Sequence, residues 1–161
     1  MKGGMSMIPK RLENLLNEKH VWFKSLVHPE AYTAQEIAAT LHVKGKELAK
    51  SVIVRANGDL VMAVLPAHCK VDFKKLREAL GEKAVKLASE DEFRGVFSDC
   101  ETGAEPPFGN LYNIETVVDR SLTEDENIYF NAGTHYEAVE MRYKDFEEIV
   151  KPRVAEFGEE P

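Results

Sequence analysis

The stretch with the clearest chemical potential is Thr102–Gly109, which reads Thr-Gly-Ala-Glu-Pro-Pro-Phe-Gly. Its prolines fix φ and remove N–H donors, while its glycines let the backbone bend and approach a ligand closely. We therefore predict a stiff loop whose remaining N–H groups point in fixed directions. Such loops bind carbonyl oxygens, oxyanions or phosphates. A connecting loop that only turns the chain is the alternative.

Two further side chains could act beside this loop. Lys50 stands where a polar connector enters an apolar strand, and there its ammonium could bind a carbonyl, a carboxylate or a phosphate. His135 follows Asn131-Ala132-Gly133-Thr134 at the end of a predicted strand, a common place for a polar side chain beside a cleft. The alternatives are a surface lysine and a hydrogen-bonded turn histidine.

The other histidines and the two cysteines form no recognisable metal-binding pattern. His68 and Cys69 are adjacent, but no second pair completes a zinc site. Cys69 and Cys100 lie outside any Cys-x-x-Cys spacing, which suggests free thiols in a reducing cytoplasm. A nucleophilic cysteine acting with His135 stays open, although no flanking signature supports it. We expect neither a metal nor a cofactor.

The surrounding sequence predicts the elements that would position these residues. Asn57-Gly58 between two apolar runs predicts a β-hairpin over residues 50–65, with both arms central in a sheet. Capping boxes predict helices that begin after Thr33 and after Ser89. Further helices are expected over residues 9–19, 71–80 and 143–150, and further strands over 21–27, 85–87, 114–119, 127–131 and 137–141. This order indicates a mixed α/β (α+β) sheet domain with helices packed around it.

Size and composition indicate a single domain, because the chain has 161 residues and 43% apolar content. We place this domain at residues 9–152, between a flexible leader (1–8) and a C-terminal tail (153–161). The sequence contains no apolar run of membrane-spanning length and no secretory signal, so we expect no membrane association and a cytoplasmic location. A net charge of −7 argues against wholesale nucleic-acid binding but leaves room for a local basic face at Lys44, Lys46 and Lys50.

Three motifs, taken together and in order, resemble a known family. They are Leu48-Ala49-Lys50-Ser51-Val52-Ile53-Val54, the run Gly103–Gly109 and the run Asn131–His135. The chain resembles the YbaK family of aminoacyl-tRNA deacylases, which includes the editing domain inserted in bacterial prolyl-tRNA synthetases. The resemblance extends from His28-Pro29 to the closing helix. It implies a mixed, largely antiparallel sheet or partial barrel surrounded by helices.

The resemblance also assigns a role to the glycine-proline loop. The family pattern Gly-x-x-x-Pro-x-Gly falls on Gly103, Pro107 and Gly109. Backbone N–H groups of this loop, which includes Ala104 and Phe108, would hold the substrate carbonyl and the oxyanion that develops from it. We therefore expect Gly103 to be catalytic and the other four residues to bind substrate.

Other site residues follow from the same resemblance. Lys50 would position the terminal adenosine and the aminoacyl ester, with Lys46 close to the acceptor end. His135 would shape or polarise a small amino-acid pocket. Tyr32 and Thr33 would line this pocket, although Thr33 is equally well explained as a helix cap. Water attack would depend on the terminal ribose hydroxyl of the tRNA, so we name no protein base.

The function implied is trans-editing, the hydrolysis of the ester of a mischarged tRNA such as tRNA-Pro carrying alanine or cysteine. The partners would be the acceptor end of aminoacyl-tRNA and either prolyl-tRNA synthetase or an elongation factor, while the oligomeric state is not predicted. Two alternatives remain. One is a non-catalytic aminoacyl or tRNA-end binding module of the same fold, and the other is a thiol-dependent hydrolase that uses Cys69 or Cys100.

Overall fold

The computed structural model describes residues 8–30, 34–41 and 44–160. An eight-stranded sheet organises the chain, with the strand order β1-β8-β7-β2-β3-β6-β9 and with β5 paired to β2 outside this order. Its central hairpin consists of β2 (Leu48–Ala56) and β3 (Asp59–Pro66). The turn residues Asn57 and Gly58 have φ angles of 50° and 94°, which confirms the predicted hairpin.

The sheet combines antiparallel and parallel pairs. Pairs β1–β8, β7–β8, β2–β3 and β2–β5 are antiparallel, whereas β2–β7, β3–β6 and β6–β9 are parallel. The remaining strands are β1 (Phe23–Val27), β5 (Val85–Leu87), β6 (Glu115–Asp119), β7 (Asn127–Asn131), β8 (Glu137–Arg142) and β9 (Arg153–Ala155). The described strands form an open sheet rather than a closed barrel, and the predicted mixed α+β class is confirmed.

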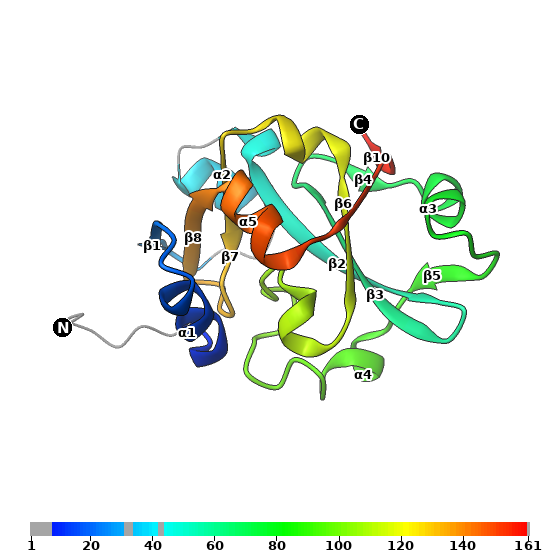
Figure 1. The fold of residues 1–161 in the computed structure, drawn as a ribbon, viewed down its shortest axis with the longest axis horizontal. Coiled ribbons are helices and arrows are strands. Elements are labelled where there is room, and N and C mark those ends of the chain that lie inside the picture. The colour runs from blue at the N-terminus through cyan, green and yellow to red at the C-terminus, as the bar shows by residue number, and fades with distance from the viewer. Residues whose placement is uncertain (1–7, 31–33, 42–43, 161) are drawn as a thin grey trace.

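Helices surround this sheet, as Figure 1 shows. They are α1 (Lys10–Glu18), α2 (Ala34–Leu41), α3 (Phe73–Leu80), α4 (Glu90–Phe93) and α5 (Tyr143–Val150), with 3-10 turns η1 (Gly45–Glu47), η2 (Gly109–Tyr112) and η3 (Arg120–Glu124). Local sequence fixes several ends. Asp72 caps α3 by accepting from the N–H groups of Lys74 and Lys75, and the predicted capping box at Ser89 and Glu92 starts α4.

Both faces of the central hairpin are buried, as its apolar arms predict. On one face Ile53, Met62 and Val64 pack with Leu12 of α1 and Phe146 of α5. On the other face lies a second cluster, which contains Val54, Val61, Ala63, Leu65, Leu76 of α3 and Phe157. A third, small cluster joins Ala38 of α2 to Leu48 and Ala67. These clusters hold the strand ends that carry the candidate site.

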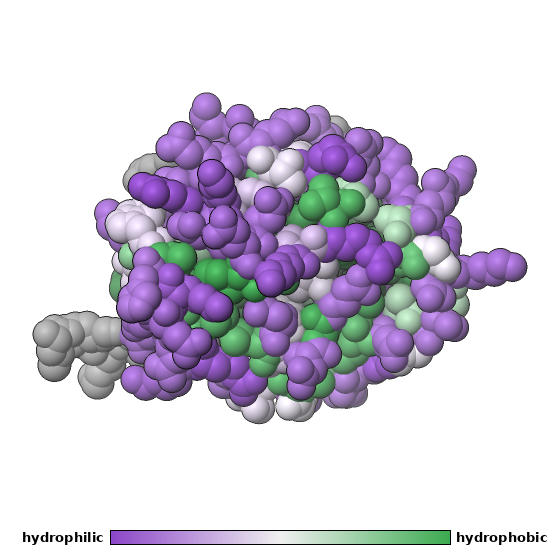
Figure 2. Space-filling view, viewed as in Figure 1, coloured by the Kyte–Doolittle hydropathy of each residue, from purple (hydrophilic) through white to green (hydrophobic). Residues whose placement is uncertain are grey.

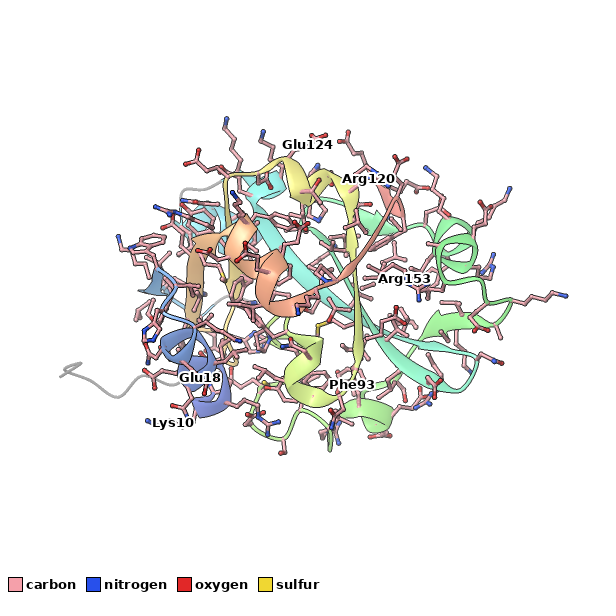
Figure 3. All side chains as sticks on the ribbon, viewed as in Figure 1. Lys10, Glu18, Phe93, Arg120, Glu124 and Arg153 are labelled. Carbon is pink, nitrogen blue, oxygen red and sulfur yellow. The ribbon has the colours of Figure 1, made fainter. Side chains whose placement is uncertain are left out.

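The residues set aside as a C-terminal tail belong to the fold. Strand β9 pairs with β6, while β10 (Gly158–Glu159) pairs with β4 (Lys70–Val71), and Phe157 between them is fully buried. Arg153, labelled in Figure 3, forms an ion pair with Glu115 at 2.8 Å. The sequence predicted a C-terminal tail here, but Val154 and Phe157 pack against core residues that lie far away in the chain. Of the predicted leader, residues 1–7 lie outside the described part, whereas Ile8 is buried.

The surface in Figure 2 is mostly hydrophilic, with scattered apolar patches. This agrees with a sequence in which 30% of residues are charged. Within the described residues, no helix has both the length and the apolar character needed to cross a bilayer.

Candidate active site

Four hydrogen bonds join the glycine-proline loop to the segment that carries His135. The Gly133 N–H donates to Ala104 O at 2.8 Å, and the Glu101 N–H donates to Gly133 O at 2.7 Å. The His135 N–H donates to Glu101 Oε1 at 2.7 Å, and His135 Nε2 lies 3.1 Å from Thr102 O. Two motifs that the sequence places about thirty residues apart therefore form one unit.

Gly103 is exposed, whereas the six residues that follow it, 104–109, are buried. Its φ of 92° lies in the left-handed region that favours glycine. A Cβ added at Gly103 would lie 3.5 Å from His135 Cε1, so the imidazole packs against the Gly103 backbone. The Gly103 N–H donates to Glu105 Oε2 at 3.2 Å. A histidine and a carboxylate thus lie next to the same glycine.

Glu105 is an unusual buried acid. It is 5% exposed, and this burial raises the pKa of its carboxyl above the usual value, although backbone N–H groups of Glu105 and Gly103 act in the opposite direction. His135 also favours the charged form of Glu105, and Glu90 disfavours it. The carboxylate is therefore incompletely compensated where it lies.

The loop donors predicted to face a ligand are already hydrogen-bonded inside the protein. The bonds run from Gly103 to Glu105 Oε2, from Ala104 to Glu101 O at 3.0 Å, from Phe108 to Pro106 O at 2.8 Å and from Gly109 to Thr116 Oγ1 at 3.0 Å. A substrate oxygen that uses any of these N–H groups must replace an internal acceptor. The acceptor of the exposed Gly103 is a side chain, which can move more readily than the backbone.

Phe108 and Gly109 anchor the loop to the rest of the fold. The Phe108 ring is fully buried, with its centroid 5.5 Å from that of Phe130 and 5.4 Å from that of Phe146. A Cβ at Gly109 would lie only 2.3 Å from Thr116 Oγ1. The Phe108 side chain therefore completes the core, and a substrate contact of this residue stays a prediction.

Lys50 lies on β2 directly after the two residue pairs that join β2 to the parallel strand β7. Strands β2 and β7 pair at Leu48–Tyr129 and Ala49–Phe130, and the next residues along them are Lys50 and Asn131. Burial lowers the pKa of Lys50, with a further lowering from Lys70 that Cys69 opposes. Asn131 Oδ1 is buried and has no hydrogen-bond partner among the described residues. The sequence reading named Lys50 but not this neighbouring amide.

Comparison with known proteins identifies the family. The description "Aminoacyl-tRNA editing domain" belongs to a family profile that matches residues 28–149, which is more than half of the chain. The chain belongs to the aminoacyl-tRNA editing domain family. The resemblance inferred from three motifs is thereby confirmed.

Individual relatives of this editing domain occur alone and within longer proteins. The chain is 30% identical over 118 residues to the uncharacterized protein YwhH of Bacillus subtilis, with 73% of this chain and 74% of YwhH covered. It is 27% identical over 159 residues to a proline–tRNA ligase of Macrococcus caseolyticus, covering 92% of this chain but 26% of the ligase. The chain therefore spans about a quarter of the ligase's length.

Solved structures share the fold of this editing domain. The crystal structure of hypothetical protein APE2540 has a TM-score of 0.84 and 26% identity, with 93% of this chain and all of that chain covered. A structure described as a proposed trans-editing enzyme for prolyl-tRNA synthetase has a TM-score of 0.83 and 19% identity, with 97% and 99% covered. At that identity the second match supports the fold alone.

The other predicted site residues of the editing domain lie in different places. Lys46 is exposed on η1, and its charge acts on Asp125, whose pKa burial raises to about 6. Tyr32 and Thr33 lie outside the described residues. Ala104 and Pro107 are buried within the loop. The described geometry thus brings Gly103, Glu105 and His135 together.

The two thiols are poorly suited to nucleophilic catalysis. Burial raises the pKa of Cys100 to about 12, and its Sγ lies 3.3 Å from the Tyr112 hydroxyl. Burial also raises the pKa of Cys69, whose side chain belongs to the second core cluster. Thiolate is the nucleophilic form, so both environments disfavour the thiol-dependent alternative. Among the described residues, no group of three or more His, Cys, Asp or Glu side chains could hold a metal ion.

Sequence reading missed Glu105 because it treated the loop mainly as a source of N–H groups. A usable signal was present, since Glu105 is flanked by Ala104, Pro106, Pro107 and Phe108. A charged residue in such an apolar stretch is buried only where it has a partner or a role. Glu101 was missed for another reason: its bond to the His135 N–H connects residues 34 positions apart.

Proposed function

We propose that this chain is a trans-editing aminoacyl-tRNA deacylase that hydrolyses the ester of a mischarged tRNA. The single observation that supports this most strongly is Gly103, an exposed backbone donor held beside His135 within an aminoacyl-tRNA editing domain. The proposed substrate is tRNA-Pro carrying a small amino acid, alanine or cysteine. The match to proline–tRNA ligases favours this tRNA.

In the proposed reaction the ester carbonyl oxygen takes the place of Glu105 Oε2 at the Gly103 N–H. Water adds to the carbonyl carbon, and the developing oxyanion stays at this N–H. The ester C–O bond then breaks, releasing the free amino acid and the ribose hydroxyl of the tRNA. His135, packed against Gly103, shapes and polarises the amino-acid pocket.

The proton of the attacking water passes to the substrate rather than to a protein base. A vicinal hydroxyl of the terminal ribose assists the attack, and the leaving ribose oxygen is protonated as the ester bond breaks. Lys50, at the separation of β2 and β7, positions the terminal adenosine and the ester. This division of roles leaves the protein to bind and orient its substrate.

The proposed contacts with tRNA are local. The net charge of −7 favours few phosphate contacts, so the acceptor end is bound through exposed Lys44 and Lys46 together with Lys50. A cytoplasmic protein of this kind would receive its substrate after release from prolyl-tRNA synthetase or from an elongation factor.

The decisive experiment is the deacylation of tRNA-Pro charged with alanine, cysteine, serine or proline. We expect rapid release of one small amino acid and a loss of about 100-fold in rate for Gly103→Ala, because the backbone donor is displaced. For Lys50→Ala we expect a loss of roughly 10–100-fold, as for a charge-assisted contact.

Gly58→Ala is the matched control for Gly103→Ala. Gly58 has nearly the same φ, 94° against 92°, but nothing lies within 4 Å of a Cβ added there. Both variants therefore carry similar backbone strain, and only the site variant should lose activity. Equal activity of the two variants would contradict the proposed role of Gly103.

The second candidate function is a non-catalytic module that binds an aminoacyl group or a tRNA end. The observation that favours it is the internal pairing of every loop donor named above, which a catalytic site must undo. Folded protein that binds charged tRNA but releases no amino acid from any of the four substrates would favour this module over the enzyme.

A further inference from the structure

Glu105 is the feature of the site that the proposed reaction leaves unexplained. A buried carboxylate beside a developing oxyanion would oppose catalysis by repulsion between like charges. Yet the loop places Glu105 Oε2 3.2 Å from the very N–H proposed to hold that oxygen, in a side chain only 5% exposed. A cation bound at the carboxylate together with the substrate would remove this repulsion.

The substrate itself carries that cation. An aminoacyl ester has a carbonyl oxygen, which accepts hydrogen bonds, and an α-ammonium group one carbon away, which donates them. The free protein has the complementary pair within the loop, a backbone N–H on Gly103 and a carboxylate on Glu105. Each member of the internal pair can therefore exchange its partner for one group of the substrate.

We propose that Glu105 binds the α-ammonium group of the aminoacyl ester and thereby selects substrates with a free amino group. This inference rests on the proposed function and deepens it, since it assigns the recognition of one substrate group to one side chain.

Binding by exchange explains how Gly103 becomes available. The Glu105 carboxylate moves from a neutral backbone N–H to a charged ammonium, which forms the stronger hydrogen bond. The Gly103 N–H released in this way then donates to the adjacent carbonyl oxygen of the ester. This exchange requires a movement of the Glu105 side chain but none of the backbone. The ammonium also compensates a carboxylate whose pKa burial raises, so its binding favours the charged form of Glu105.

The consequence is a rejection of acylated amino groups. An N-acyl aminoacyl ester, which includes every peptidyl ester, presents a neutral amide in place of the ammonium. It cannot compensate the carboxylate, and Glu105 would then keep its bond to the Gly103 N–H. The site would therefore edit aminoacyl-tRNA and leave peptidyl-tRNA intact.

The first test measures binding without hydrolysis. The probes are 3′-deoxy-3′-(L-alanylamino)adenosine, whose amide link cannot be cleaved as an ester, and its N-acetyl derivative, titrated by calorimetry. We expect wild-type protein to prefer the free amine by roughly 10–100-fold, the range for one hydrogen bond to a charged group. Glu105→Gln should lose this preference, since the amide keeps the shape and an acceptor for Gly103 but has no charge.

Glu90→Gln is the control for a general effect of charge. Glu90 lies close enough to influence Glu105 electrostatically, but its side chain is exposed on α4 and pairs with Arg94 at 3.2 Å. Its variant should keep the full preference for the free amine. Thermal melting of both variants establishes that they are folded.

The outcomes separate this inference from the proposed function. Equal or undetectable binding of the two probes by wild type, or a preference that survives in Glu105→Gln, would overturn the role of Glu105. A second assay compares hydrolysis of alanyl-tRNA and N-acetyl-alanyl-tRNA, where the same variant should narrow the gap between the two rates. If no charged tRNA is hydrolysed while the binding preference and its loss are observed, the proposed enzyme fails and the recognition by Glu105 stands.

Discussion

Asp119 and Glu105 are two carboxylates with nearly equal burial and opposite electrostatics. They are 6% and 5% exposed, and burial acts on both in the direction that raises the pKa. For Asp119 this effect is outweighed by hydrogen bonds from Ser121, Phe157 and Gly158, so its pKa is lowered. For Glu105 the effect of burial prevails and the pKa is raised. The fold supplies more hydrogen-bond donors to the Asp119 carboxyl than to the Glu105 carboxyl.

This contrast separates a structural carboxylate from one that is available to a ligand. Asp119 receives the Phe157 N–H at 2.9 Å and the Gly158 N–H at 2.7 Å, and it thereby fastens the C-terminal strands. In Figure 3, Arg120, the residue after Asp119, lies towards the upper edge of the molecule, whereas Phe93 of α4, which precedes the loop, lies towards the lower edge. A buried group that the fold leaves incompletely compensated is a functional candidate.

The largest effect we expect is from Asp119→Ala. The substitution leaves the N–H groups of Phe157 and Gly158 without their acceptor, so we predict a loss of about 3 kcal/mol in the free energy of unfolding, measured with urea. Deacylation by the remaining folded protein should be unchanged. Asp59→Ala, at an exposed position in the hairpin, is the control. If Asp119→Ala lost deacylation activity but kept its stability, Asp119 would be a functional carboxylate rather than a structural one.

The pH dependence of this variant has a definite sign. The pKa of Asp119 in the folded protein is below the ordinary value of 3.8. Its contribution is therefore fully present above that value and is lost as the pH falls through the folded pKa. The stability difference between wild type and Asp119→Ala should shrink only in strong acid. A difference that already disappears between neutral pH and pH 5 would contradict the lowered pKa.

Elements set by neighbouring residues could be predicted from the sequence. The Asn57-Gly58 turn, the Asp72 position before α3 and the Ser89–Glu92 capping box all depend on contacts within a few residues. The apolar arms of the hairpin also predicted burial on both faces, because a strand exposed on one face would alternate. Local chemistry was sufficient for these features.

Features that depend on distant partners could not be predicted in this way. The Phe157 N–H donates to Asp119, 38 residues earlier, so the sequence around Phe157 predicted a C-terminal tail rather than a buried residue. The occupied N–H groups of the loop and the burial of Phe108 between Phe130 and Phe146 likewise follow from tertiary packing. The site motifs were found in sequence, but the partner of each donor was not.

An intermediate effect is expected for Glu105→Gln, in the opposite direction from Asp119→Ala. Replacing the buried charge with an amide should stabilise the protein by about 1 kcal/mol at pH 7, or roughly 2–4 °C in Tm. The pKa of Glu105 is raised above the ordinary 4.5, so the cost of its charge is present above the folded pKa and vanishes as the pH falls to 4.5. The higher stability of Glu105→Gln relative to wild type should therefore disappear as the pH falls from the folded pKa of Glu105 to 4.5.

Neighbouring groups must be controlled in that titration. The charges of His135 and Glu90 both act on the Glu105 carboxyl. Glu90→Gln measured over the same pH range gives the contribution of the nearby surface acid. A Glu105→Gln protein that melts below wild type at pH 7 would show that the fold already compensates this carboxylate, as it does for Asp119.

The smallest effect is expected from modifying the thiols, and it tests whether a raised pKa alone makes a buried group functional. Burial raises the pKa of Cys100 to about 12, and the charge of Glu105 acts in the same direction. We predict that iodoacetamide labels the native protein slowly at pH 7 and leaves deacylation unchanged, with Cys100→Ser as the control. Inactivation in step with labelling, abolished by this variant, would restore the thiol-dependent alternative. Burial disfavours the charged form of both groups. Only Glu105 contacts Gly103, where the proposed α-ammonium group of the substrate would compensate its charge, so only Glu105 should be required.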